Sequence, residues 1–220
     1  MKQGRRNFLK VTSIALAGLT IDPLRAVTTN NNFYVNRALG LAFYKPNNWH
    51  YVKVSDLVEL KKKLSLADEW KDIEQYVWEN TGEPICIIAK YDQNNPQNIG
   101  KYSPSIAVWA EPKSDYEEYN FEGLVQYSDT MASARMNYIK DSDLINKKYV
   151  STNGNVSIIE YDLEYTLLHE ELSKALRVQT KMVYAEHGSY YYCFDFVDCK
   201  EANQVEEDEF NRFREGINLI

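Results

Sequence analysis

Residues 40–49, GLAFYKPNNW, decide the fold that we predict for this chain. Leu41 and Phe43 alternate with two residues of the opposite face, which is the period of a short β-strand. Pro46 ends the strand because its nitrogen cannot donate to a neighbouring strand, and two asparagines then favour a turn. Trp49 follows at once, where a tryptophan usually closes one end of a hydrophobic core. The stretch therefore predicts a strand, a turn and a core tryptophan, and it predicts no chemistry.

The other periodic segments predict an α+β domain. Apolar residues at helical spacing predict helices, whereas β-branched or alternating runs predict strands. Asn153-Gly154 is typical of a hairpin turn, and strands joined by short turns must pair antiparallel. We therefore expect an antiparallel β-sheet flanked by helices, an αβα sandwich. The expected helices cover 55–64, 65–82, 119–140 and 203–217, and the expected strands after Trp49 cover 85–91, 105–110, 159–167, 176–185 and 190–197.

Residues 159–167 have the clearest strand pattern. Apolar and aromatic residues at the odd positions alternate with Glu160, Asp162 and Glu164. In an antiparallel sheet this pattern is typical of a strand with one face in the core and one in solvent. We therefore expect the three carboxylates to be solvated.

The order of these elements, opened by G-x-x-F-x-x-P-x-x-W, resembles the PsbP-like family. The matching residues are Gly40, Phe43, Pro46 and Trp49, and the resemblance spans about residues 33–220. That family includes the extrinsic photosystem II protein, a Ran-binding nuclear transport factor and several bacterial exported proteins. The resemblance implies an antiparallel sheet between helical layers and a non-catalytic, partner-binding role. Because family members share no active site, it implies no functional residues here. The second half of the chain also resembles the family. The matching features are Asn153-Gly154, Tyr190 to Tyr192 and a closing helix with Phe210 and Phe213.

The first 26 residues are typical of a targeting segment. Residues 4–10, GRRNFLK, resemble the twin-arginine export motif S/T-R-R-x-F-L-K and depart from it at Gly4. A weakly apolar stretch follows, and we expect cleavage at the small residue Ala26. The alternative is an ordinary secretory signal with two arginines in its basic end. Residues 27–32 are then a polar linker and residues 33–220 a single domain. The export-motif residues are Arg5, Arg6, Phe8, Leu9 and Lys10.

The charge of the chain argues against nucleic-acid binding. The net charge is −7 at pH 7, and residues 1–26 carry five basic residues and one acid, so the rest carries −11. Such a surface repels nucleic acid and anionic lipid. No apolar run is long enough to span a membrane. We therefore expect an exported bacterial protein, periplasmic or otherwise outside the cytoplasm, with no nucleic-acid partner and no transmembrane segment in its mature chain.

The sequence contains no motif for catalysis or cofactor binding. A Walker loop, a G-x-S-x-G elbow, a dinucleotide glycine fingerprint and C-x-x-C are all missing. His169-Glu170 begins like a zinc-protease motif, but no second histidine stands four positions after the first. His50 and His187 are expected at a strand edge and in a turn. The acidic run 206–209 lacks the spacing of a calcium loop and is typical of a helix N-terminus. We expect no catalytic residue, no cofactor and no metal site.

Three cysteines, Cys86, Cys193 and Cys199, make an odd number for an exported protein. Cys193 and Cys199 would lie too far apart along an extended chain for a disulfide, unless the chain folds back. Cys86 could pair with Cys193 if their strands were neighbours. We expect buried free thiols that pack as small apolar groups.

Together these expectations give one functional hypothesis and one alternative. The hypothesis is an exported, non-enzymatic domain that binds a protein or cell-envelope partner. The alternative is a small-ligand or metal-binding module, or a hydrolase, with its site between sheet and helices. His169 and the acids beside it are the first candidates for that alternative site.

Overall fold

The computed structural model describes residues 32–52, 84–92, 95–98, 102–116, 120, 121, 123, 143–151, 157–167, 175–199 and 204–220. Several predicted features lie outside these ranges and stay predictions: the export motif, Ala26, His169, Asn153-Gly154, the helices over 55–82 and most of the helix over 119–140.

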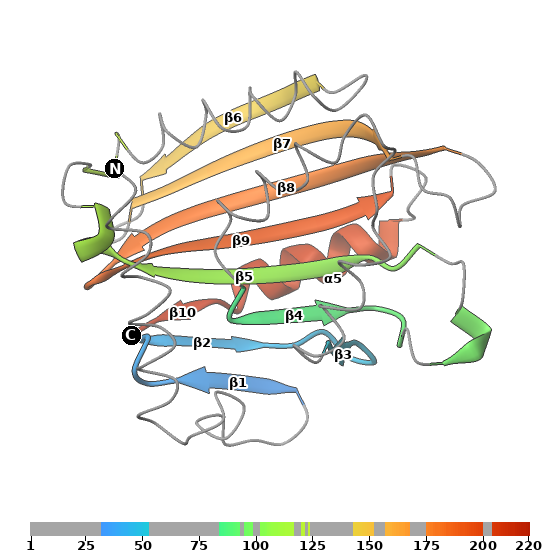
Figure 1. Cartoon of the computed structure of the whole chain (residues 1–220), viewed down its shortest axis with the longest axis horizontal. Helices are drawn as coiled ribbons and strands as arrows, with labels where there is room; N and C mark the ends of the chain where they lie inside the picture. The colour runs from blue at the N-terminus through green and yellow to red at the C-terminus, as the bar shows by residue number, and fades with distance from the viewer. Residues whose placement is uncertain are drawn as a thin grey trace.

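A seven-stranded antiparallel sheet makes up most of the described structure (Figure 1). Its strand order is β3-β4-β5-β9-β8-β7-β6. The last four strands along the chain before the helix lie beside one another in sequence order, as expected of strands that follow one another closely. The strands are β3 (His50–Tyr51), β4 (Cys86–Ala89), β5 (Ser105–Pro112), β6 (Asp143–Ser151), β7 (Ser157–Leu167), β8 (Leu176–His187) and β9 (Tyr190–Cys199).

A second, three-stranded antiparallel sheet joins the two ends of the described chain. It consists of β1 (Phe33–Asn36), β2 (Leu41–Tyr44) and β10 (Asn218–Leu219), in the order β1-β2-β10. The strand predicted from residues 41–44 is therefore confirmed as β2. Its partner on one side is nearby in the sequence, whereas its partner on the other side is the last strand of the chain.

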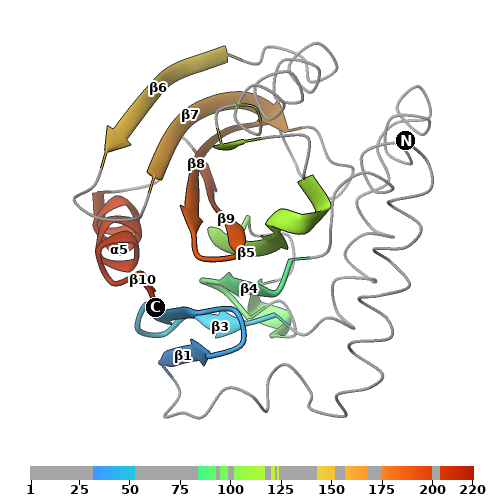
Figure 2. The same ribbon diagram turned by 90° about the vertical axis from the view of Figure 1, so that its left-hand side faces the viewer.

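Helix α5 (Gln204–Glu215) and the three-stranded sheet lie on the same side of the curled seven-stranded sheet (Figure 2). The helix ends where the Gly216 N–H donates to the carbonyl oxygens of Arg212 and Phe213, at 3.1 and 3.0 Å. Ile217, expected inside the helix, packs against the core just beyond it. Two short 3-10 helices, η2 (Pro96–Asn98) and η3 (Lys113–Tyr116), complete the described elements. None of the described helices has the length and apolar composition that a membrane crossing needs.

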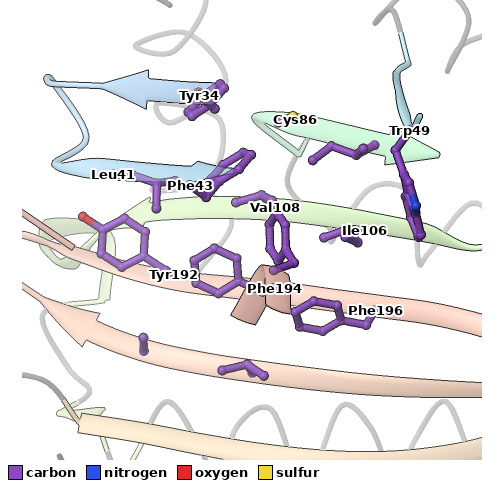
Figure 3. Packing of buried hydrophobic residues seen from close by; sticks show 14 residues of the cluster. Tyr34, Leu41, Phe43, Trp49, Cys86, Ile106, Val108, Tyr192, Phe194 and Phe196 are labelled. Carbon is purple, nitrogen blue, oxygen red and sulfur yellow. The ribbon is translucent and has the colours of Figure 1, made fainter. Parts of the chain in front are cut away.

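The main hydrophobic core fills the space between the two sheets and α5 (Figure 3). Phe43 of β2 packs against Phe213 of α5 with ring centroids 5.0 Å apart, and Phe196 of β9 contacts the same phenylalanine at 5.6 Å. Trp49 is 2% exposed, so the predicted core tryptophan is confirmed. Further members of this core are Tyr34, Leu41, Ile88, Ile106, Val108, Tyr192 and Phe194.

The prediction that Glu160, Asp162 and Glu164 are solvated is wrong. They lie on the face of β7 that looks toward α5, and Glu164 is only 6% exposed. The opposite face of β7 is also covered: Ile159 and Tyr161 form a second cluster, packed against Phe121, Met182 and Tyr184. Alternation correctly separated the two faces of the strand, but both faces are covered.

Candidate functional site

The turn between β1 and β2 is held by one side chain and one glycine. The Asn36 side-chain oxygen accepts a hydrogen bond from the Leu39 N–H at 3.1 Å. Gly40 has a φ of 62°, in the left-handed region that favours glycine. On its far side, the Ile220 N–H donates to the Gly40 carbonyl oxygen at 2.8 Å. The turn therefore fixes both neighbours of β2.

The Pro46 turn is held together by Lys45, the residue before it. Lys45 is 7% exposed, and its amine donates to the carbonyl oxygens of Trp49 and Pro46, the second at 3.4 Å. The amine also lies 5.8 Å from the centre of the Tyr51 ring. Burial lowers the pKa of Lys45. Asn48 supplies the positive φ that the turn needs, 63°.

Trp49 is tied to α5 through a shared carboxylate. Its indole N–H donates to Glu209 at 3.2 Å, and the Lys90 amine binds the same oxygen at 3.1 Å. The indole ring also contacts Phe210 edge to face, with centroids 5.6 Å apart. These contacts connect the Pro46 turn, the end of β4 and the helix. We therefore assign them a role in stabilising the fold.

An aromatic pair lies on the outer face of the three-stranded sheet. Phe33 and Tyr44 are opposite each other in the β1–β2 register, and their ring centroids are 4.5 Å apart. Tyr44 is 60% exposed, in contrast to the buried rings of the inner face. The next residue of β1 to face this way is Val35, and Arg37 follows at the strand end, exposed. The alternation in the sequence placed Tyr44 on the face opposite Leu41 and Phe43, but it did not show that an aromatic pair would lie exposed there.

The charged side chains of β7 are used inside the fold. Arg214 of α5 binds Glu160 at 3.2 Å, and Lys181 lies 3.7 Å from Asp162. The third pair joins the Arg177 guanidinium to the nearly buried carboxylate of Glu164, at 3.3 Å. These pairs hold α5 and β8 against β7, since each joins β7 to a neighbouring element.

Two tyrosines, a lysine and two glutamates gather where η3 meets β8 and β9. Lys113 binds Glu186 at 2.7 Å and lies 5.5 Å from the centre of the Tyr191 ring. Tyr116 donates to Glu111 and packs on Tyr191 edge to face. Burial, followed by the Glu186 charge, raises the pKa of Tyr191. A phenol with a raised pKa stays protonated at neutral pH, so it offers no nucleophile.

The three cysteines are free thiols. Cys86 faces the main core, and burial raises its pKa to about 12. Cys193 is paired with Trp109 in register, on the opposite face, and β5 separates its strand from β4. A Cys86–Cys193 disulfide is therefore excluded, and Cys199 is held away from Cys193 by the continuous strand β9. Cys86 is buried as expected, whereas Cys193 and Cys199 are half-buried.

The histidines in the described ranges do not form a site. His50 is exposed on the edge strand β3, and His187 is the last residue of β8, directly before the turn. Among the described residues, no three His, Cys, Asp or Glu side chains come together as a metal site. Within the described ranges, the surface that we identify as a candidate binding site is therefore the outer face around Phe33 and Tyr44.

Comparison with known proteins supports the fold. No family model and no curated protein matches the chain. Among solved structures, the chain is similar to the solution structure of cyanobacterial PsbP (CyanoP) from Synechocystis sp. PCC 6803. The TM-score is 0.52 at 13% sequence identity, over 88% of this chain and 95% of that chain. The fold is therefore PsbP-like and built on antiparallel sheets, and this degree of likeness shows the fold alone.

Proposed function

We propose that the chain is an exported, non-enzymatic domain that binds a protein partner. The observation that carries the proposal is the exposed aromatic pair: Tyr44 is 60% exposed and its ring lies 4.5 Å from that of Phe33. Aromatic side chains are enriched at protein interfaces, where they bury a large apolar area with few rotatable bonds. Exposed apolar groups that gather on one face are typical of interaction sites.

Two further observations support partner binding over catalysis. The charged residues on the covered face of β7 are used in ion pairs that hold α5 and β8 in place. The cluster around Tyr191 is likewise built from contacts that join η3 to the sheet. The PsbP-like fold agrees with this proposal only at the level of architecture.

Export and the complete layering belong to the same proposal. Residues 4–10 and Ala26 support export by the twin-arginine route, to the periplasm or beyond. The helical patterns over 55–82 and 119–140 support helices that would cover the sheet and complete the αβα arrangement. The acidic net charge of −7 favours a protein over nucleic acid or an anionic lipid surface as the partner.

Purification of the tagged full-length chain from the cell envelope tests the proposal. We expect the chain to elute with a second protein in a fixed ratio, and the complex to re-form from the two purified proteins. A chain that elutes alone and retains a metal or a small molecule in a fixed ratio would contradict the proposal. It would favour the ligand-binding alternative, and loss of that ligand in His169→Ala would then locate the site.

A further inference from the structure

The edge of β1 has hydrogen-bonding groups that β2 does not use. In the β1–β2 register, the Lys45 N–H donates to the Asn32 carbonyl oxygen at 2.6 Å, which marks that pair as hydrogen-bonded. Hydrogen-bonded and non-hydrogen-bonded pairs alternate along an antiparallel ladder. The N–H and C=O groups of Phe33 and Val35 therefore point away from β2. Within the described ranges, neither residue has a backbone hydrogen-bond partner on that side.

This edge lacks the lysine, the proline and the bulge that block strand addition at other sheet edges. Proteins protect such edges by keeping them short, by placing lysine or proline on them, or by a bulge. Strands β3 and β10 have two residues each. Strand β6 carries Lys147 and Lys148 and has a register shift near its start. Strand β1, with the four residues FYVN, is longer than β3 and β10 and has no charge, no proline and no register shift. It is the lowest of the labelled strands in Figures 1 and 2, at the opposite end from β6.

The side chains beside this edge indicate what would add to it. Phe33 and Val35 present apolar groups on the outer face, next to the exposed ring of Tyr44. Arg37 follows at the end of β1, exposed, and makes no ion pair within the described ranges. The net charge of −7 repels a second whole copy at long range, whereas the exposed guanidinium of Arg37 attracts a single acidic side chain at short range.

We propose that β1 is a strand-addition site for an extended segment of a protein partner that carries one acidic residue opposite Arg37. The segment becomes a fourth strand of the β1-β2-β10 sheet, and main-chain hydrogen bonds to Phe33 and Val35 supply the affinity. Side chains at alternate positions give the specificity: two apolar residues opposite Phe33 and Val35, and an Asp or Glu opposite Arg37. This inference rests on the proposed partner-binding function and names the surface that performs it.

Amide hydrogen exchange in the full-length chain tests the proposal. The probe is a short synthetic peptide with Glu-Thr-Val-Thr-Val at its centre, and a peptide with Lys in place of Glu is its control. We expect the Glu peptide to slow exchange at the Phe33 and Val35 N–H groups. Exchange at the Tyr34 N–H should not change, because in this register it already bonds to β2. Unchanged exchange at Phe33 and Val35 in saturating Glu peptide would overturn the proposal.

Two variants make the test specific. Val35→Pro removes an N–H that β2 does not use and is expected to fold, because proline is accepted on an edge strand when its nitrogen faces outward. It should weaken binding of the Glu peptide at least about tenfold, whereas Val35→Thr, which keeps the N–H, should bind like the parent. Arg37→Glu alters an exposed side chain and should reverse the preference between the Glu and Lys peptides. Equal peptide binding by folded Val35→Pro, or an unreversed preference in Arg37→Glu, would each overturn the proposal.

The result for the edge can be separated from the result for partner binding. A stable complex between the chain and its protein partner that Val35→Pro leaves intact would overturn the edge assignment and leave the proposed function standing. Self-association of the parent chain that Val35→Pro abolishes would place a second copy on β1, and this too would overturn the assignment to a segment of a protein partner.

Discussion

Gly40 meets two demands that only glycine satisfies together. Its φ of +62° is a conformation that costs a side-chain-bearing residue about 1–2 kcal/mol. A Cβ at this position would also lie 2.7 Å from a backbone oxygen of Ile220, which is closer than real Cβ atoms approach backbone. The residue therefore sets both the turn that leads into β2 and the close approach of β10.

Gly40→Ala is expected to lower the free energy of unfolding by more than the conformational cost alone, about 2 kcal/mol or more, because Ile220 must move. Urea denaturation measures the loss. Gly188→Ala is the matched control: its φ is +53°, but a Cβ there meets nothing within 4 Å, so only about 1 kcal/mol should be lost. Equal losses in the two variants would show that the contact with Ile220 has no energetic weight.

The raised pKa of Cys86 predicts how the free energy of unfolding changes at alkaline pH. Burial raises its pKa from 9.0 to about 12, so the folded chain keeps a thiol proton that the unfolded chain loses. The folded state then binds more protons, and stability must fall as pH rises from 9 toward about 12, by up to about 1.4 kcal/mol per pH unit. Lys45, whose pKa is lowered, acts in the opposite direction because the folded state releases its proton first.

The thiol effect is isolated by comparing Cys86→Ala with the parent chain. We expect the variant to be less stable below pH 9, owing to the small cavity, but to lose stability less steeply above it. Urea denaturation at a series of pH values gives both slopes, and the contribution of Lys45 cancels in their difference. Parallel slopes would mean that the thiolate forms as easily in the folded chain as in the unfolded one.

At the scale of elements, Glu209 connects α5 to the Pro46 turn. Removing it in Glu209→Ala leaves the buried Trp49 N–H without the acceptor that the structure gives it. An unsatisfied buried donor costs about 1–3 kcal/mol, and we expect a loss of stability in that range. Thermal unfolding of the full chain measures it. Glu215→Ala, which alters an exposed glutamate on the same helix, should change stability by less than about 0.5 kcal/mol.

A second pair of variants locates the effect. If Glu209 acts through the indole N–H, then Trp49→Phe and Glu209→Ala should not add, because the first change already removes the donor. Additive losses would instead assign the contribution of Glu209 to Lys90 alone, which shares the same carboxylate oxygen.

Elements with a local signal were predictable, and those fixed by distant packing were not. Residues 41–44 alternate and end at a proline, so β2 was predicted with its bounds. Glu160, Asp162 and Glu164 carry the same kind of alternation, but their environment depends on α5, which follows almost 40 residues later and supplies Arg214. An alternating pattern of apolar and charged residues indicates that a strand has two different faces, but it does not indicate what covers each face.

The candidate site likewise has one feature that the local sequence predicted and one that it did not. The alternation placed Tyr44 opposite the core face of β2, and its exposure agrees with that placement. The pairing of β2 with β10 joins residues at opposite ends of the described chain, so no local pattern indicated that β1 would be left as an edge. Pairing between strands far apart in the sequence depends on contacts that form only when distant parts of the chain come together. The local propensity of a segment for helix or strand carries no information about those contacts.

At the scale of the whole molecule, the proposed export route and the free thiols bear on one another. All three cysteines are free, which is the state that the proposed twin-arginine route favours, because a chain on that route folds in the reducing cytoplasm. Folding before export is what the twin-arginine route requires. The proposed route and the state of the cysteines therefore support each other.

Replacing Arg5 and Arg6 together by lysine tests the route, because it keeps the positive charge and removes the arginine pair. A general secretory signal needs only a basic end, so it should still export the double variant, whereas a twin-arginine signal should not. We expect the exported fraction, measured by cell fractionation and immunoblotting, to fall at least about tenfold while the cytoplasmic chain stays folded. Lys2→Arg, which leaves the pair intact, should export like the parent. Undiminished export of the double variant would assign the chain to general secretion, and its thiols would then have to escape oxidation by their half-buried or buried positions alone.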